Sequence, residues 1–122
     1  MKFRHTLALA AGLALSGATA LAGEIVIATV NNGHMIEMQK LTPHFEKAHP
    51  GITVKWVTLE EGTLRSRVTT DIATKGGQFD VMTIGMYETP IWGKKGWLKE
   101  IQPDAAYDVG DLLPAIRDGL SV

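Results

Sequence analysis

Three short apolar runs along the chain predict β-strands. Residues 24–30 (EIVIATV) are rich in β-branched side chains, are too short for a typical helix and end at a turn-forming Asn-Asn-Gly cluster. Residues 52–58 (ITVKWVT) alternate between apolar and polar side chains, as a strand with one partly exposed face does. Residues 80–85 (DVMTIG) form the third run. We therefore expect a buried first strand followed by two more.

In the segments between these runs, apolar residues recur at helical spacing. Residues 36–48 place apolar side chains three or four positions apart, and Pro43 inside the pattern should kink the helix or end its first part. Residues 64–74 repeat apolar positions every four residues, and we expect Gly76 and Gly77 to supply the left-handed cap that ends this helix. Both segments are long enough to cross over a sheet.

The last third of the chain predicts two further helices. Thr89 before Pro90 is typical of an N-cap followed by proline in the first turn, and the helix should end at Gly96. A final helix should begin at Asp111, with Leu112, Leu113, Ile116 and Leu120 as its apolar side. Because the chain stops just after this apolar side, we expect a truncated domain that leaves these side chains exposed.

Strands alternating with helices through short turns predict an α/β fold, an open and mostly parallel sheet with helices on both faces. Ligands of such sheets bind outside the carboxyl ends of the strands, where the strand order reverses. Three turns occupy that position, residues 31–34, 59–62 and 85–89. We expect any binding site to be built from them.

The first 22 residues have the pattern of a secretory signal peptide. Lys2 and Arg4 form a basic start, residues 7–15 are apolar, and small residues lead to a cleavage site for which we prefer the bond after Ala22. The apolar run falls well short of the roughly 20 residues that a membrane-spanning helix needs. Residues 23–122 then form the mature part, one domain at most.

The composition of the chain limits the classes of partner that it can bind. Loss of Lys2 and Arg4 with the signal leaves 10 basic side chains against 13 acidic ones, without the clustered positive charge that nucleic-acid binding requires. The chain has no cysteine, which excludes disulfides and the lipid-anchoring cysteine of bacterial lipoproteins. We therefore expect a periplasmic protein without a lipid anchor that binds a small soluble ligand.

The three turns carry groups suited to a polyhydroxylated ligand, since amides and carboxylates pair with hydroxyls and an aromatic face covers a carbon chain. These groups are Asn31, Asn32, Glu60, Glu61, Tyr87, Glu88 and the nearby Trp92. Each has an alternative role: the asparagines can form turns and caps, the glutamates can lie in a solvated turn before a helix, and Trp92 can be buried. Trp56 and Trp97 are expected in the core.

Motifs for chemistry are absent from the sequence. Adjacent Glu60 and Glu61 are poorly placed for glycoside cleavage, which needs two carboxylates on opposite sides of one bond. The histidines lack a metal-ligand spacing such as HExxH, and there is no nucleophile elbow, Walker loop or GxGxxG. The sequence predicts a binding surface with no catalytic residues, metal or cofactor.

Four stretches carry a family resemblance: ATVNNGHMIEMQKLTPHFE, WVTLEEGTLRSRVTTDIATKGGQFDVMTIGMYETPIW, GWLKEI and DLLPAIRDGL. They resemble family 1 extracellular solute-binding proteins, in particular the branch that binds sorbitol and mannitol for an ABC importer. The resemblance implies two α/β lobes joined by a hinge, of which residues 23–122 are the N-terminal portion of lobe I. The ligand-binding candidates it implies are Asn31, Asn32, Glu60, Glu61, Gly85 and Tyr87, followed by Arg65 and Trp92.

The resemblance implies a monomeric, non-enzymatic substrate-binding subunit that captures a sugar or sugar alcohol in the periplasm and delivers it to the inner-membrane permease. Two other hypotheses stay open. The chain could belong to a secreted α/β enzyme acting on carbohydrate, with its catalytic residues beyond Val122, or to the ligand-sensing domain of a receptor. For Arg65, pairing on the helix surface is the alternative to ligand contact.

Overall fold

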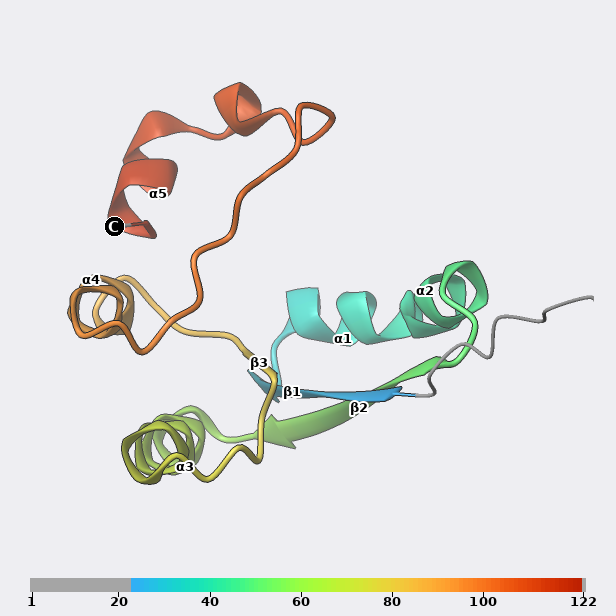
Figure 1. The fold of residues 1–122 in the computed structure, drawn as a ribbon, viewed down its shortest axis with the longest axis horizontal. Coiled ribbons are helices and arrows are strands. Elements are labelled where there is room, and N and C mark those ends of the chain that lie inside the picture. The colour runs from blue at the N-terminus through green and yellow to red at the C-terminus, as the bar shows by residue number, and fades with distance from the viewer. Residues whose placement is uncertain (1–22, 122) are drawn as a thin grey trace, which may run out of the picture.

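The computed structural model describes residues 23–121 and forms a three-stranded sheet with helices on both faces (Figure 1). The expected signal peptide, residues 1–22, lies outside the described residues. The elements in chain order are β1 (Gly23–Val30), α1 (Gly33–Lys40), α2 (Thr42–Ala48), β2 (Ile52–Leu59), α3 (Glu61–Thr74), β3 (Val81–Met82), α4 (Glu88–Lys94), a 3₁₀ turn η1 (Val109–Asp111) and α5 (Pro114–Gly119).

Strand order places the first strand in the centre of the sheet. β1 pairs in parallel with β2 along its whole length, from Gly23 opposite Ile52 to Val30 opposite Leu59, and with β3 on its other side. The resulting order is β2-β1-β3. α1 and α2 lie on one face of the sheet and α3 on the other (Figure 1). The predicted α/β class, with parallel strands covered on both faces, is confirmed.

Proline divides the first crossover as expected. α1 ends at Lys40 and α2 begins at Thr42, with Pro43 in its first turn, where a missing backbone N–H costs nothing. Helical structure starts at Gly33, earlier than the apolar spacing indicated, because the Asn32 side chain caps α1. The apolar side chains that recur three or four positions apart in residues 36–48 are largely solvent-exposed. The exposed fraction is 50% for Met38 and 54% for Leu41.

Three boundaries between the end of β2 and the start of α4 differ from the sequence-based expectation. The turn after β2 is shorter than expected, because Glu60 is itself the N-cap of α3 and Glu61 is its first residue. The third strand pairs only over Val81–Met82. Thr89 is not an N-cap: α4 already begins at Glu88, and the Thr89 hydroxyl donates to the Gly85 carbonyl at 2.9 Å.

Lys75, rather than a glycine, is the first left-handed residue after α3. Its φ of 54° is the positive value seen at the C-cap, and its backbone N–H donates to the Ile72 carbonyl. Gly77 follows with a φ of 67°, so two of the three residues after the helix are left-handed. The predicted left-handed end of α3 is correct, but the prediction that Gly76 and Gly77 form it is only half right.

The core lies between the sheet and α3, closed at one end by α4. Its buried apolar members are Ala28, Leu64, Val68, Phe79 and Trp92. Trp97 packs against this cluster, as expected, and is partly buried. The expectation that Trp56 lies in this core is wrong: it is half-buried on the α2 side, where its indole N–H donates to Thr42 Oγ1 at 2.8 Å.

The C-terminal segment covers little of this core. Leu113 is 71% exposed and Ile116 is 50% exposed, so the expected exposure of the apolar side of the last helix is confirmed. Helical structure there begins only at Pro114, after the 3₁₀ turn, instead of at Asp111. The sequence also suggests that Trp97, Leu98 and Ile101 pack as a short extended piece before Pro103, but Ile101 is 85% exposed.

A buried carboxylate holds the loop between α3 and β3. Asp71 is 3% exposed, and both its oxygens lie 3.0 Å from the backbone nitrogen of Gln78. A Cβ added to Gly76 would overlap this carboxylate. The loop that leads into β3 therefore depends on an acceptor at position 71 and on a glycine at position 76.

Replacing Asp71 with alanine should lower the free energy of unfolding by about 1–3 kcal/mol, because the Gln78 N–H loses a charged, part-buried acceptor. Asp71→Asn keeps an acceptor oxygen and should cost less. Urea denaturation of the two variants measures the difference. Equal stability of Asp71→Ala and the wild type would contradict this role.

Candidate functional site

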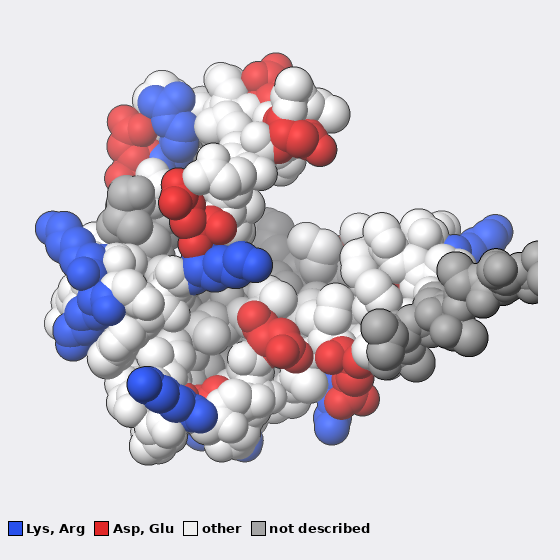
Figure 2. All heavy atoms as spheres, in the orientation of Figure 1, with Lys and Arg blue, Asp and Glu red and all other residues white. Residues whose placement is uncertain are grey.

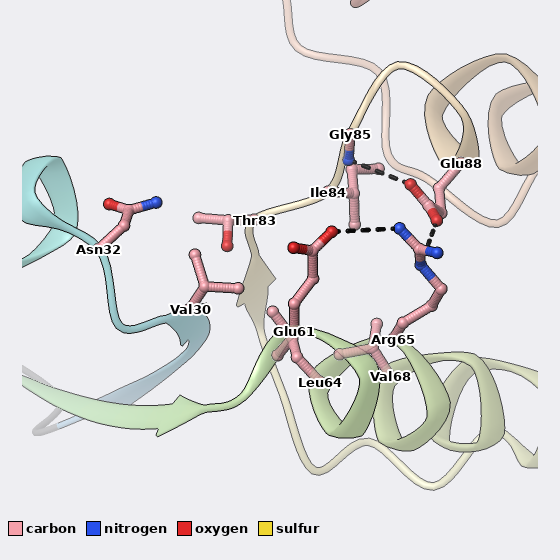
Figure 3. Close-up of a pocket in the computed structure, with 10 residues that line it drawn as sticks. All are labelled: Val30, Asn32, Glu61, Leu64, Arg65, Val68, Thr83, Ile84, Gly85 and Glu88. Carbon is pink, nitrogen blue, oxygen red and sulfur yellow. Dashed lines mark hydrogen bonds and ion pairs between the residues drawn. The ribbon is translucent and has the colours of Figure 1, made fainter.

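Two adjoining hollows lie at the carboxyl ends of the strands. The first encloses about 320 Å³ and is lined by Val30, Asn32, Glu61, Leu64, Arg65, Val68, Thr83, Ile84, Gly85 and Glu88 (Figure 3). The second is lined by Val30, Asn31, Asn32, Ile36, Gln39, Thr58, Leu59, Glu60 and Glu61. Val30, Asn32 and Glu61 border both, so the two hollows adjoin at the end of β1, and together they are called the depression.

The first hollow lies where the direction of strand addition reverses. β2 is on one side of β1 and β3 is on the other. The crossover after β1 therefore leads to one side of the central strand, and the crossover after β2 leads to its other side. Loops after β1 and β3 separate at such a point and leave a crevice, which is where open α/β sheets bind their ligands. Val30, the last residue of β1, borders this crevice on one side, and Thr83, the first residue after β3, borders it on the other.

Arg65 is the cationic group of the first hollow. Its Nε atom lies 2.7 Å from Glu88 Oε1, and its Nη2 atom lies 3.4 Å from Glu61 Oε1. Glu61 and Arg65 are one helical turn apart on α3, whereas Glu88 comes from the first turn of α4. Figure 3 shows the guanidinium between the two carboxylates. One cation and two anions thus line this side of the hollow.

Asn32 serves the fold and faces the site at the same time. Its Oδ1 atom accepts a hydrogen bond from the Met35 N–H at 2.9 Å, which caps α1. The capping role considered as the alternative for this asparagine is therefore present. Because the cap uses the side-chain oxygen, the amide nitrogen is the group that can donate to a ligand.

Glu60 caps α3 in the same way. The Thr63 N–H donates to its Oε2 atom at 3.1 Å. Hydrogen bonds from the backbone N–H of Gly62, and then of Thr63, lower the pKa of Glu60 from its ordinary value of 4.5. The carboxylate is therefore charged in the folded protein under all but acidic conditions.

Acid should weaken the fold partly through Glu60. Because its folded-state pKa is lowered, its contribution to stability is full above the unfolded-state pKa and is lost as pH falls through the folded-state value. An NMR titration of the Glu60 side-chain carboxyl carbon should give a midpoint below 4.5. Glu60→Gln should flatten the loss of stability on acidification, and a midpoint at or above 4.5 would contradict the capping geometry.

Six of the eight predicted site residues border the depression: Asn31, Asn32, Glu60, Glu61, Arg65 and Gly85. The other two lie elsewhere. Tyr87 is 73% exposed and lines neither hollow, and Trp92 is 5% exposed within the core. The burial of Trp92 corresponds to the alternative that the sequence left open.

Two polar residues of the first hollow, Thr83 and Glu88, were not among the eight predicted ligand-binding residues. Thr83 follows β3, and its hydroxyl lies 3.0 Å from that of fully buried Thr29 on β1. Glu88 was named among the polar groups of the third predicted turn, but no feature of the sequence indicated that its carboxylate turns inward. The sequence carried no signal for Thr83, because the third strand was predicted over residues 80–85 and Thr83 lies within that range.

Side-chain charge around the site is mixed. On the face seen in Figure 2, Lys and Arg alternate with Asp and Glu without a large area of one sign. Within residues 23–121, no group of three or more His, Cys, Asp or Glu side chains is placed to hold a metal ion. In the same part of the chain, no helix has the length and apolar character needed to cross a membrane.

Comparison with known proteins gives consistent matches. Residues 32–121 match the family model described as bacterial extracellular solute-binding protein. The chain is 58% identical, over 114 residues and 93% of its length, to a mannitol-binding protein of Pseudomonas aeruginosa, and covers 26% of that protein.

A solved structure also matches the chain. The crystal structure of an ABC transporter solute-binding protein from Agrobacterium vitis, with bound D-mannitol, superimposes with a TM-score of 0.77 at 64% identity. The match covers 83% of this chain and 25% of that one, so the chain spans about a quarter of the length of these relatives. The fold and the family match together show that this chain belongs to the bacterial extracellular solute-binding proteins.

Proposed function

We propose that the chain forms part of the substrate-binding subunit of an ABC importer for a sugar alcohol of the mannitol type. The observation that carries the proposal is its 64% identity to a solute-binding protein solved with D-mannitol, combined with an open hollow at the β1/β3 switch point. The subunit would capture the polyol in the periplasm as a monomer and deliver it to the inner-membrane permease without catalysis or a cofactor.

The chemistry of the hollow suits a linear polyol. Glu61 can accept hydrogen bonds from hydroxyls, while Arg65 and the Asn32 amide can donate them. Val30 and Ile84 give the hollow apolar walls against which a carbon chain can pack. Hydrogen bonds that involve a charged group are stronger than neutral ones, so the carboxylate and guanidinium would contribute most of the polar binding energy.

An opposing lobe would complete the site. The hollow is open to solvent on one side, and a hinge motion of the kind known for periplasmic binding proteins would close a second lobe over the ligand. The part of the site described here would then supply about half of the contacts. Export through a signal peptide cleaved after Ala22, without a lipid anchor, is part of the same proposal.

An NMR titration of the chain with D-mannitol tests the proposed site. Backbone shifts should change around Asn32, Glu61, Arg65 and Gly85, and the α2 segment, residues 42–48, should stay unchanged as an internal control. With one lobe, we expect weak and saturable binding. Shift changes with an amino acid but not with D-mannitol would overturn the proposal.

The enzyme alternative has no support from these relatives, since the matched family and both proteins are described as solute-binding or mannitol-binding. A direct check is incubation of the chain with an oligosaccharide and a polyol, followed by chromatography. We expect both to be recovered unchanged.

A further inference from the structure

Glu88 is a buried carboxylate at the rim of the first hollow. It is 6% exposed, and a charged group in that position is costly unless it is paired. The Gly85 N–H donates to its Oε2 atom at 3.2 Å, and Arg65 Nε lies 2.7 Å from its Oε1 atom. The contact with Arg65 is an ion pair, and Oε1 accepts no hydrogen bond from any described residue. Glu88 thus ties α4 and the loop after β3 to α3.

The two partners of the ion pair differ in exposure. The Arg65 side chain is 55% exposed, whereas that of Glu88 is 8% exposed. A long arginine side chain at a half-exposed position has many rotamers in solution. An anchored carboxylate at its Nε atom restricts those rotamers, and the two Nη groups then project from the far side of the guanidinium. Figure 3 shows this end of Arg65 directed towards Glu61.

We propose that Glu88 is a positioning residue for polyol recognition, acting through Arg65. It holds the guanidinium so that the Nη groups can donate to adjacent hydroxyls while Glu61 accepts from them. Ordering of Arg65 before the ligand arrives reduces the entropy lost on binding, and reduced ordering cost raises affinity. This inference rests on the proposed function, because it concerns the same hollow and the same ligand class.

A purely structural role for Glu88 makes different predictions. In that case the hydrogen bond from the Gly85 N–H would stabilise the fold, and the negative charge opposite Arg65 would have no effect on ligand binding. Glu88→Gln separates the two roles, because the amide oxygen can still accept from the Gly85 N–H while the negative charge is removed. Glu88→Ala removes both interactions and reports on the structural contribution.

The first experiment observes the Arg65 Nε–H signal in ¹H–¹⁵N spectra of the chain without ligand. In the wild type, its chemical shift should differ from those of the other arginine signals, because the Glu88 carboxylate lies 2.7 Å from Nε. In Glu88→Gln it should move to the chemical shift of a surface arginine, while the Gly85 amide signal stays close to its wild-type position. The Arg67 Nε–H signal, on the same helix but outside the hollow, is the internal control.

The second experiment repeats the D-mannitol titration with Glu88→Gln, for which we expect binding about 10-fold weaker than in the wild type. An unchanged Arg65 signal in Glu88→Gln would overturn the inference, as would an unchanged affinity despite loss of that signal. If the wild type itself does not bind D-mannitol, the proposed function and the role of Glu88 in polyol recognition both fail. The unliganded spectra would then still show whether Glu88 orders Arg65.

Discussion

Replacing Arg65 with glutamine is expected to weaken D-mannitol binding by about 10- to 100-fold, the effect of losing a hydrogen bond from a charged donor. The measurement needs a complete site. A chimera supplies it, in which residues 23–122 replace the matching segment of the P. aeruginosa mannitol-binding protein, to which the chain is 58% identical. Isothermal titration calorimetry of the chimera and its variant gives the two dissociation constants.

Arg67→Gln is the matched control for this experiment. Arg67 lies on the same helix, but its Nη2 atom contacts the Gln78 side chain at 3.5 Å and its guanidinium lies over the Phe79 ring, 5.7 Å from the centroid. It lines neither hollow. The control should bind D-mannitol like the unmodified chimera. Equal losses in both variants would show that Arg65 acts through overall charge or folding and not as a ligand contact.

Trp92→Ala should lower the free energy of unfolding by about 3–5 kcal/mol, the usual cost of removing a large aromatic side chain from a core. Trp92 is 5% exposed, and its ring centroid lies 6.2 Å from that of Trp97. A loss of this size is a large fraction of the stability of a small domain, which is typically about 5–15 kcal/mol. Urea denaturation of the chain followed by circular dichroism measures it.

Trp92→Phe distinguishes a core role from the ligand contact that the sequence left open. Phenylalanine keeps an aromatic ring in the core, so we expect most of the stability to remain. In the chimera, its D-mannitol affinity should match that of the unmodified protein. A large loss of affinity in a stably folded Trp92→Phe variant would show that Trp92 contacts the ligand.

The fold was predictable because its signals are local. Apolar runs of strand length and apolar spacing of helical period alternate along the chain, and this order leaves few topologies other than a parallel sheet. Boundaries were less predictable where a side chain competes for the backbone. Asn32 extends α1 back to Gly33, and Glu60 starts α3 directly after β2, because each caps its helix.

Only those site residues that directly follow a strand could be predicted from the sequence. Asn32, Glu61 and Gly85 follow three different strands, so the parallel sheet brings them to one edge. Side-chain direction in the third turn was not predictable, because it depends on how α4 packs. Glu88 turns inward to Arg65 while its neighbour Tyr87 is 73% exposed, and no periodicity distinguishes adjacent residues in a short turn.

Calorimetry of the unmodified chimera with D-mannitol, sorbitol, maltose and an amino acid such as glutamine tests the central claim most directly. The claim is that the depression around the end of β1 forms one half of a polyol site. We predict saturable binding of D-mannitol with one site per protein and no detectable heat with glutamine. Absence of binding to D-mannitol, sorbitol and maltose by a folded chimera, together with binding of glutamine, would contradict the account.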